Sequence, residues 1–375
     1  MRPVFAIVAA VSALWPLSAS AQRPIQTHGV SFGIRAYGTT KDGQKVFEYV
    51  LRNRRGAEVH FIDYGGIITE IDVPDSNGRK ANVALGFGSL ADYEAHNQDY
   101  RFGAIIGRYA GRIAGARFAV GGKEVKLVAN DGPNALHGGA LPGFDSKVWS
   151  AELRFRDDAA VLRYTSPDGE QGFPGKLRVT VTYRLLDDDS LCIDYSATTT
   201  RPTHINFTNH SYFNLAGAGS GTVLDQTLEV PSSRYAEAGD GGIPTGRLLP
   251  VAGTALDFRT PKPLRECLTI AEKGCNHSWA LPFDRKLHLA ARVADPTSGR
   301  VMDVLTTEPS IHVYTAGYMS GKDIGAQGVP YRAFDAVALE AQHFQDTPHR
   351  PEFPITLLKP GQVYRATTIY RFSVR

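Results

Sequence analysis

A single carboxylate, Glu340, lies within the largely apolar segment Ala336-Val-Ala-Leu-Glu-Ala-Gln-His-Phe344. Burying an unpaired charge is costly or shifts the pKa of the group, so such a residue is either compensated by a partner or functional. If residues 337–344 form a strand, alternation places Glu340, Gln342 and Phe344 on one face. A carboxylate, an amide and an aromatic ring on one surface suit the binding of a sugar.

Four other segments place polar side chains within apolar or glycine-rich surroundings. Each also has a structural explanation, because arginines are usually surface charges, and histidines or aspartates in turns often only satisfy backbone groups or form ion pairs. The candidates are Arg112 in Gly107-Arg-Tyr-Ala-Gly-Arg112, His137 in Asn134-Ala-Leu-His-Gly-Gly139, His210 in Thr208-Asn-His-Ser-Tyr-Phe-Asn214 and Asp257 in Thr254-Ala-Leu-Asp-Phe-Arg259.

Three kinds of chemistry can use these side chains. A metal site is disfavoured, because the sequence has no His-x-His, His-Glu-x-x-His or paired-Cys spacing. Asp257 and Glu340 could form the carboxylate pair of a glycoside hydrolase, which their separation in space would decide. A carboxylate base and a histidine acid could instead transfer protons without a cofactor. The residues alone leave these last two possibilities open.

The elements that must position these residues are predicted to be strands. Residues 177–185 alternate apolar and polar side chains, and residues 191–195 repeat the pattern after a turn, which predicts a hairpin. Residues 67–73 and 364–374 alternate likewise, and no long amphipathic helix is evident. Because no segment has the composition of a linker, we predict one all-β domain, residues 22–375, built as a sandwich or barrel.

The first 21 residues have the features of a secretory signal peptide, with a short basic start, an apolar run and small residues before Gln22. We expect cleavage after Ala21 and a periplasmic or secreted product. No later apolar run is long enough to suggest a membrane helix. A net charge of +3 without a basic stripe argues against a nucleic-acid partner.

The chain has three cysteines. After export they would meet an oxidising compartment, in which Cys267 and Cys275 could pair and leave Cys192 as a small buried side chain. Their spacing does not decide whether they do.

The five candidate segments, taken in order, resemble the aldose 1-epimerase (galactose mutarotase) family over almost the whole chain that follows the signal peptide. The resemblance rests on motifs at residues 104–113, 134–139, 208–217, 253–259 and 339–344, and extends from Asp63-Tyr-Gly-Gly to Leu358-Lys-Pro-Gly361. It implies a single large antiparallel β-sandwich. It also implies interconversion of the α and β anomers of free aldoses such as glucose and galactose, in hexose metabolism.

The resemblance also implies roles for individual residues. Glu340 would take the proton from the anomeric hydroxyl while His210 protonates the ring oxygen, so that the ring opens and recloses on the other face. Opposite charges in one cleft would favour an ionised base and a protonated acid. Arg112, His137, Asp257 and His312 would bind the sugar. No cofactor and no metal is required, and we expect a monomer whose partner is a small aldose.

Four residues depart from the usual family pattern. Gly111 stands where many members have Asn, His312 where Gln is frequent, Asn276 where Asp is common, and Gln345 where Pro is frequent. These departures bear on sugar preference more than on activity. Two alternatives stay open, namely a glycoside hydrolase built on Asp257 and Glu340, and a sugar-binding module without catalysis. A phosphorylated sugar is disfavoured because no added Lys and Arg cluster lies near the motifs.

Overall fold

The computed structural model describes residues 25–27, 29–140 and 142–375. The predicted signal peptide, its cleavage site after Ala21 and the new terminus at Gln22 lie outside these residues. Strands dominate the described chain, and all strand pairs within its sheets are antiparallel. The prediction of an all-β antiparallel fold is therefore confirmed.

The N-terminal part forms a six-stranded sheet in which the strands follow one another in chain order. Short turns connect them, so each strand pairs with its neighbour in sequence. The strands are β1 (Ile25–Thr27), β2 (Val30–Thr39), β3 (Lys45–Arg52), β4 (Glu58–Ile62), β5 (Ile68–Pro74) and β6 (Lys80–Asn82).

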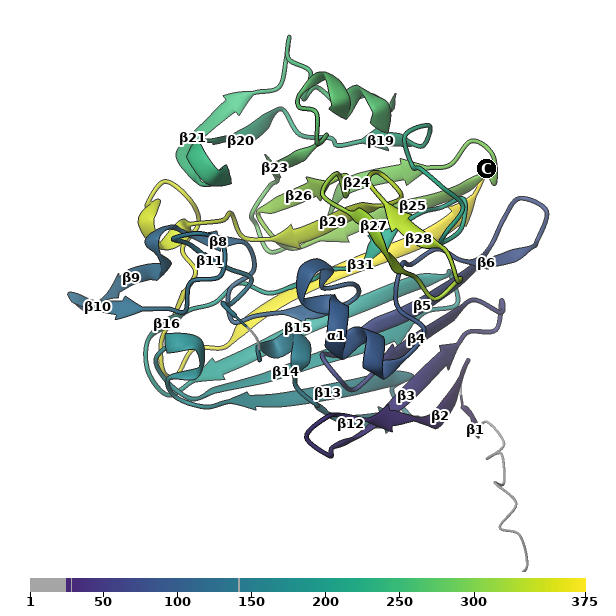
Figure 1. Cartoon of the computed structure of the whole chain (residues 1–375), viewed down its shortest axis with the longest axis horizontal. Coiled ribbons are helices and arrows are strands. Elements are labelled where there is room, and N and C mark those ends of the chain that lie inside the picture. The colour runs from purple at the N-terminus through teal and green to yellow at the C-terminus, as the bar shows by residue number, and fades with distance from the viewer. Residues whose placement is uncertain (1–24, 28, 141) are drawn as a thin grey trace, which may run out of the picture.

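A nine-stranded sheet forms the largest layer, and the last strand of the chain runs through its middle (yellow in Figure 1). The predicted hairpin is confirmed, because Leu185 pairs with Leu191, and the buried positions of residues 177–185 alternate as expected. In spatial order the strands are β12 (Ser150–Arg154), β13 (Ala159–Ser166), β14 (Leu177–Leu185), β15 (Ser190–Thr199), β31 (Tyr364–Val374), β25 (Arg300–Thr306), β24 (His288–Ala294), β19 (Thr227–Glu229) and β22 (Lys262–Pro263).

A second six-stranded sheet carries much of the candidate site. In spatial order its strands are β18 (Tyr212–Phe213), β29 (Val337–Gln342), β26 (Ser310–Tyr314), β23 (Asn276–Ala280), β20 (Arg234–Ala238) and β21 (Pro244–Pro250). Val337, Leu339 and Ala341 of β29 belong to the main hydrophobic core, which also includes residues of the nine-stranded sheet. One face of β29 is thus fixed by apolar packing, and the other is free to hold polar groups.

Short two-stranded pairs and one α-helix complete the part of the chain that the structure describes. The pairs are β9 (Arg117–Val120) with β10 (Lys123–Lys126), β8 (Arg112–Ile113) with β11 (Ala135–Leu136), β16 (Thr203–His204) with β30 (Leu357–Leu358), β7 (Ile105–Ile106) with β17 (Thr208–Asn209), and β27 (Ser320–Ile324) with β28 (Pro330–Arg332). Short 3-10 segments lie at Ala114–Ala116, Phe144–Ser146, Glu170–Gly172, Asp240–Gly242, Leu264–Thr269 and Thr347–His349.

The helix α1 (Leu90–Tyr100) was not evident from the sequence. The hydroxyl of Ser89 caps its first turn by accepting from the backbone N–H of Asp92. It ends at Arg101, which has a left-handed conformation (φ 56°) and donates its N–H to Asn97 O.

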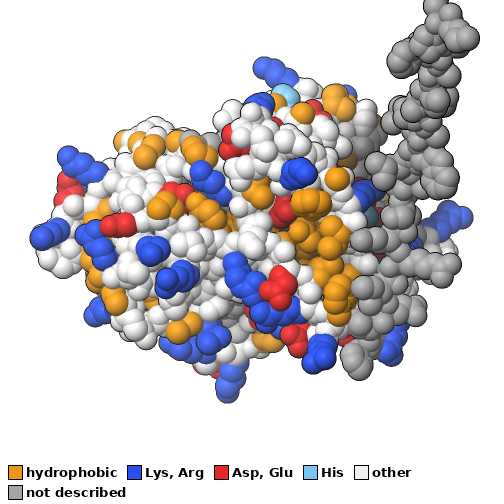
Figure 2. Space-filling view, turned by 90° about the horizontal axis from the view of Figure 1, so that it is seen from below, with side chains coloured by type: hydrophobic (Ala, Val, Ile, Leu, Met, Phe, Trp, Pro, Cys, Tyr) orange, Lys and Arg blue, Asp and Glu red, His pale blue; other side chains and the backbone are white. Residues whose placement is uncertain are grey.

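Cys267 and Cys275 form a disulfide, and Cys192 is free and buried. Among the described residues, no helix is both long and apolar enough to cross a bilayer. On the face shown in Figure 2, Lys and Arg side chains lie dispersed among acidic, apolar and neutral groups.

Candidate active site

The candidate site is a cavity of about 190 Å³. One face of the second six-stranded sheet forms its floor, because strand register places site residues in rows. Ser278 pairs with His312, and His312 pairs with Glu340, so one row crosses β23, β26 and β29. The adjacent row, two residues along each strand, contains Asn276 and Tyr314. Since alternate residues of a strand share a face, all these side chains point to the same side.

Backbone hydrogen bonds between β8 and β11 bring Arg112 and His137 to the cavity. His137 has a left-handed conformation (φ 52°), and its N–H donates to Gly111 O at 3.0 Å. In return, the N–H of Gly111 donates to His137 Nδ1 at 3.2 Å. This bond requires Nδ1 to be an acceptor, so the ring hydrogen of neutral His137 lies on Nε2.

His210 follows β17 directly and is fixed by its backbone. Its N–H donates to Ala104 O, its carbonyl accepts from Gly103 N, and its ring stacks on Tyr212 with centroids 5.0 Å apart. The ring of His137 meets it edge to face, also at 5.0 Å. The His210 ring is therefore held by packing rather than by polar contacts of its own.

His210 and Glu340 form the centre of the site. His210 Nε2 lies 3.6 Å from Glu340 Oε1, and each residue is 3% exposed. His210 Nδ1 and Glu340 Oε2 make no hydrogen bond within the described chain. Buried polar atoms are nearly always satisfied in native proteins, so two unsatisfied atoms on side chains that line one cavity indicate a place for a ligand.

Burial shifts the pKa of both groups toward the uncharged form. It raises the pKa of Glu340 to about 8, opposed by the nearby Arg112 guanidinium. It lowers the pKa of His210 to about 3, with Arg101 adding to the effect. The expectation that opposite charges would favour a carboxylate and an imidazolium is not met, because desolvation is the larger effect.

Two arginines border the pair, and each is already partnered by an acid. Arg112 Nε donates to Asp131 Oδ2 at 2.7 Å, and Arg101 Nε lies 3.1 Å from Asp145 Oδ2. These acids hold the guanidinium groups in place and offset their charge, so the site does not present a strong positive field.

A second polar group lies beside the pair. His312 Nε2 lies 2.7 Å from Asn276 Oδ1, and His312 Nδ1 lies 2.8 Å from Ser278 Oγ and 3.4 Å from Gln345 Nε2. Burial and Arg112 lower the pKa of His312 to about 3, so its ring is neutral. With the ring hydrogen on Nε2, that nitrogen donates to Asn276 Oδ1 and Nδ1 accepts from the Ser278 hydroxyl, while the longer contact from Gln345 Nε2 shares the same lone pair only weakly.

The structure thus brings Glu340, His210, Arg112, His137 and His312 together around one cavity. Asp257 is not among the lining residues, and we correct that expectation. Its carboxylate accepts two hydrogen bonds from the Arg259 guanidinium, at 2.7 and 2.8 Å, in a local ion pair. The carboxylate pair of a glycoside hydrolase, Asp257 with Glu340, is consequently not assembled.

The prediction that Glu340, Gln342 and Phe344 share one face of a strand is also only partly right. The strand β29 ends at Gln342, so alternation does not continue to Phe344. Phe344 packs on Phe353 at 4.4 Å between ring centroids, and neither Gln342 nor Phe344 lines the cavity. The cavity amides come instead from Asn276 and Gln345. Sequence reasoning missed the remaining lining groups, which include Tyr100, Arg101, Tyr212, Tyr314 and Tyr318.

His137, His210 and Glu340 each have a ligand atom within 4.8 Å of the other two. Two imidazoles and a carboxylate are a donor set that can hold zinc. The same atoms are those that proton transfer needs, so geometry alone supports either use.

Comparisons with known proteins identify the family of this chain. The aldose 1-epimerase family model matches residues 48–371. Galactose mutarotase of Homo sapiens is 41% identical over 84% of this chain and 91% of its own length, and aldose 1-epimerase of Escherichia coli is 36% identical over 88% and 96%. The crystal structure of galactose 1-epimerase from Lactobacillus acidophilus superposes with a TM-score of 0.79 at 25% identity, covering 92% of this chain and 98% of that one. The chain therefore belongs to the aldose 1-epimerase family.

Proposed function

We propose that this protein interconverts the α and β anomers of free aldoses such as glucose and galactose. The observation that carries the proposal is the His210–Glu340 pair, with Nε2 and Oε1 3.6 Å apart and both side chains lining a sugar-sized cavity. Anomer exchange needs one proton removed from the anomeric hydroxyl and one delivered to the ring oxygen. One acid and one base at the same reacting unit can do both.

Glu340 takes the anomeric proton and His210 protonates the ring oxygen. The bond between C1 and the ring oxygen breaks, the aldehyde group rotates, and reclosure returns both protons. No atom or electron leaves the sugar. Arg112 and His137 orient the ring, and Tyr100, Tyr314 and Tyr318 offer aromatic and hydroxyl contacts along the cavity wall.

The resting pair holds a single proton between pH values of about 3 and 8, because the pKa of His210 lies near the first value and that of Glu340 near the second. A carboxylic acid with an imidazole, and a carboxylate with an imidazolium, contain the same one proton. The reactive form is thus reached by moving that proton within the site. Hydrogen bonds from a bound sugar and the charge of Arg112 stabilise the carboxylate form.

Polarimetry on freshly dissolved α-glucose or α-galactose tests the proposal. We expect the optical rotation to reach equilibrium faster than in buffer, by an amount proportional to enzyme concentration. Folded protein that accelerates none of the common aldoses would refute the proposed function. If such protein still bound a sugar in calorimetry, it would be a binding module instead.

We also propose that the protein is exported, that its signal peptide is cleaved after Ala21, and that it acts as a monomer in the periplasm or outside the cell. The basic, apolar and small-residue order of residues 1–21 supports export, and the Cys267–Cys275 disulfide suits an oxidising compartment. N-terminal sequencing of protein from cell fractions and sedimentation in solution test these points. A cytoplasmic product that begins at Met1 would contradict export.

A further inference from the structure

Gly111 and Gln345 compete for the same space at the edge of the cavity. Gly111 has a left-handed conformation (φ 78°), and a Cβ atom built on it would lie 2.5 Å from Cγ and 3.0 Å from Cδ of Gln345. Real Cβ atoms do not approach other carbons so closely, and the contact is with the middle of the Gln345 side chain rather than with its flexible end. Any side chain at position 111 therefore requires Gln345 to move.

Movement of Gln345 would break its polar contacts with Arg112 and His312. Its Oε1 accepts from the backbone N–H of Arg112 at 3.0 Å, and its Nε2 lies 3.4 Å from His312 Nδ1. Gln345 is 5% exposed, and it lines the cavity. The Gln345 amide thus connects two candidate sugar-binding residues. It contacts the backbone of Arg112 and the ring of His312.

The hydrogen-bond directions leave donors for a ligand. An amide nitrogen carries two hydrogens, and His312 Nδ1 can accept only one of those on Gln345 Nε2. On the other side of the ring, Asn276 Oδ1 accepts from His312 Nε2, so the Asn276 amide nitrogen keeps its hydrogens. This wall of the cavity consequently offers N–H donors from Gln345 and Asn276, beside the Arg112 guanidinium.

We propose that Gln345, in the space left by Gly111, is a specificity-determining contact that donates a hydrogen bond to one hydroxyl oxygen of the sugar. The inference rests on the proposed function. It adds that the chain prefers sugars with a hydroxyl group placed to accept a hydrogen bond from Gln345. Gly111 and Gln345 are coupled, because the Gln345 side chain occupies the space that a Cβ atom at position 111 would need. Glycine is required at position 111 only while Gln345 lies there.

The test measures kcat and KM of Gln345→Ala for the aldoses that the wild type accepts and for their monodeoxy analogues. We expect KM to rise about tenfold for the complete sugars, the loss of one hydrogen bond, with kcat changed by less than about twofold. For the one deoxy sugar that lacks the contacted hydroxyl, wild type and variant should have equal KM. Gln98→Ala, on the exposed side of α1, is the matched control and should change neither constant.

The second arm tests the coupling. Asn tolerates left-handed backbone better than most residues, so Gly111→Asn isolates the collision with Gln345. We expect Gly111→Asn to lower both the melting temperature and kcat/KM, and Gly111→Asn combined with Gln345→Ala to recover the melting temperature. Additive effects of the two substitutions, or a uniform rise of KM for every deoxy sugar, would overturn the inference.

The failure of this inference is distinguishable from the failure of the proposed function. If wild type accelerates anomer exchange while Gln345→Ala matches it on every sugar, only the inference fails. If wild type accelerates no aldose, the proposed function fails, and calorimetric affinities of the same sugars for wild type and Gln345→Ala still decide the role of Gln345.

Discussion

Within the described part of the chain, two histidine–carboxylate pairs have both side chains buried, and they differ in their surroundings. In one pair His210 Nε2 lies 3.6 Å from Glu340 Oε1, and in the other His343 Nε2 lies 3.5 Å from Glu308 Oε2. All four side chains are almost inaccessible. Residue type, distance and burial therefore do not separate the two pairs.

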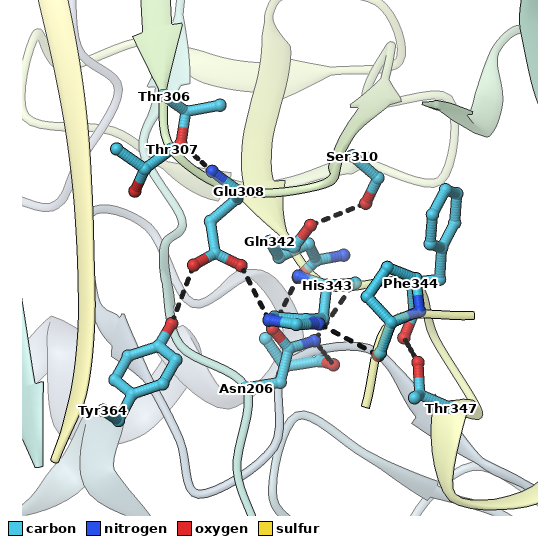
Figure 3. Close-up of polar contacts among 12 residues, drawn as sticks. Asn206, Thr306, Thr307, Glu308, Ser310, Gln342, His343, Phe344, Thr347 and Tyr364 are labelled. Carbon is cyan, nitrogen blue, oxygen red and sulfur yellow. Dashed lines mark hydrogen bonds and ion pairs between the residues drawn. The ribbon is translucent and has the colours of Figure 1, made fainter. Parts of the chain in front are cut away.

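The remaining contacts do separate them. Figure 3 shows the second pair enclosed by partners, with Glu308 Oε1 accepting from the Tyr364 hydroxyl at 3.0 Å. Asn206 Oδ1 accepts from the backbone N–H of His343 at 2.9 Å, and His343 Nδ1 lies 3.3 Å from Pro354 O. Among the described residues, Glu308 Oε2, like Glu340 Oε2, makes no hydrogen bond, so an unsatisfied oxygen occurs in both pairs. The pairs differ because His210 and Glu340 line the cavity, whereas His343 and Glu308 do not, and because His210 Nδ1 has no hydrogen-bond partner in the described chain. We infer that the enclosed pair stabilises the fold and that the open pair serves a ligand.

The largest expected contrast is in catalysis. Glu340→Gln should lower kcat/KM by about 100- to 10,000-fold, because it removes the base. The variant should be at least as stable as wild type at pH 7, since burial of Glu340 is unfavourable to its charged form. Polarimetry and thermal unfolding measure both.

Glu308→Gln is the matched control on the enclosed pair. It should leave the rate at the wild-type value, because neither Glu308 nor His343 lines the cavity. The melting temperature should change little at pH 7, because burial also raises the pKa of Glu308 and the amide oxygen of Gln can still accept from the Tyr364 hydroxyl. If Glu308→Gln abolished activity in folded protein, or if Glu340→Gln retained the wild-type rate, the division between the two pairs would be wrong.

The second contrast is in pH dependence. The rate should fall about tenfold per pH unit above about 8, where the open pair loses its only proton, and fall again below about 3, where a second proton binds. Tyr364→Phe, which removes the hydroxyl that donates to Glu308 of the enclosed pair, should leave both the acidic and the alkaline fall of the rate unchanged. The measurement is kcat/KM across pH after subtraction of the buffer rate, and a profile flat through pH 8 to 10 would contradict the role of the open pair.

A smaller effect is expected on stability from the enclosed pair. Tyr364→Phe removes the hydroxyl that donates to Glu308 and should lower the free energy of unfolding by about 1–3 kcal/mol. Urea unfolding measures this change. Tyr318→Phe, at the exposed end of the cavity, is the comparison variant and should change the free energy of unfolding by less than about 0.5 kcal/mol.

The smallest expected effect is that of metal removal. We expect dialysis against a chelator to leave kcat unchanged, because the proposed reaction uses His137, His210 and Glu340 as proton-transfer and binding groups. A loss of activity that added zinc restores would show instead that these three side chains hold an ion.

The strands and the central carboxylate were predictable from sequence because their signals are local. Period-two alternation identified β14, β15 and β31, and the apolar neighbours of Glu340 marked it as unusual. The helix α1 was missed because its largely polar composition hides the apolar periodicity that predicts a helix, and the cap formed by Ser89 is known only from the structure.

Most errors in the predicted site concern residues that reach the cavity through contacts with distant parts of the chain. Asp257 is an exception, because its ion-pair partner Arg259 lies only two residues later in the chain, and the sequence already allowed an ion pair there. Asn276 reaches the cavity only because β23 pairs with β26, which lies more than thirty residues further along the chain. The place of Gln345 beside Gly111 depends on a contact between residues separated by more than two hundred positions. No local pattern contains that information.

The row of Ser278, His312 and Glu340 across three paired strands has a consequence for protein engineering. Side chains alternate along a strand, so one inserted residue within β26 would turn Ile311 or Val313 toward the sugar and His312 into the core. Inserted peptides, affinity tags or fused domains therefore belong in exposed turns such as residues 284–287, where strand pairing is unaffected.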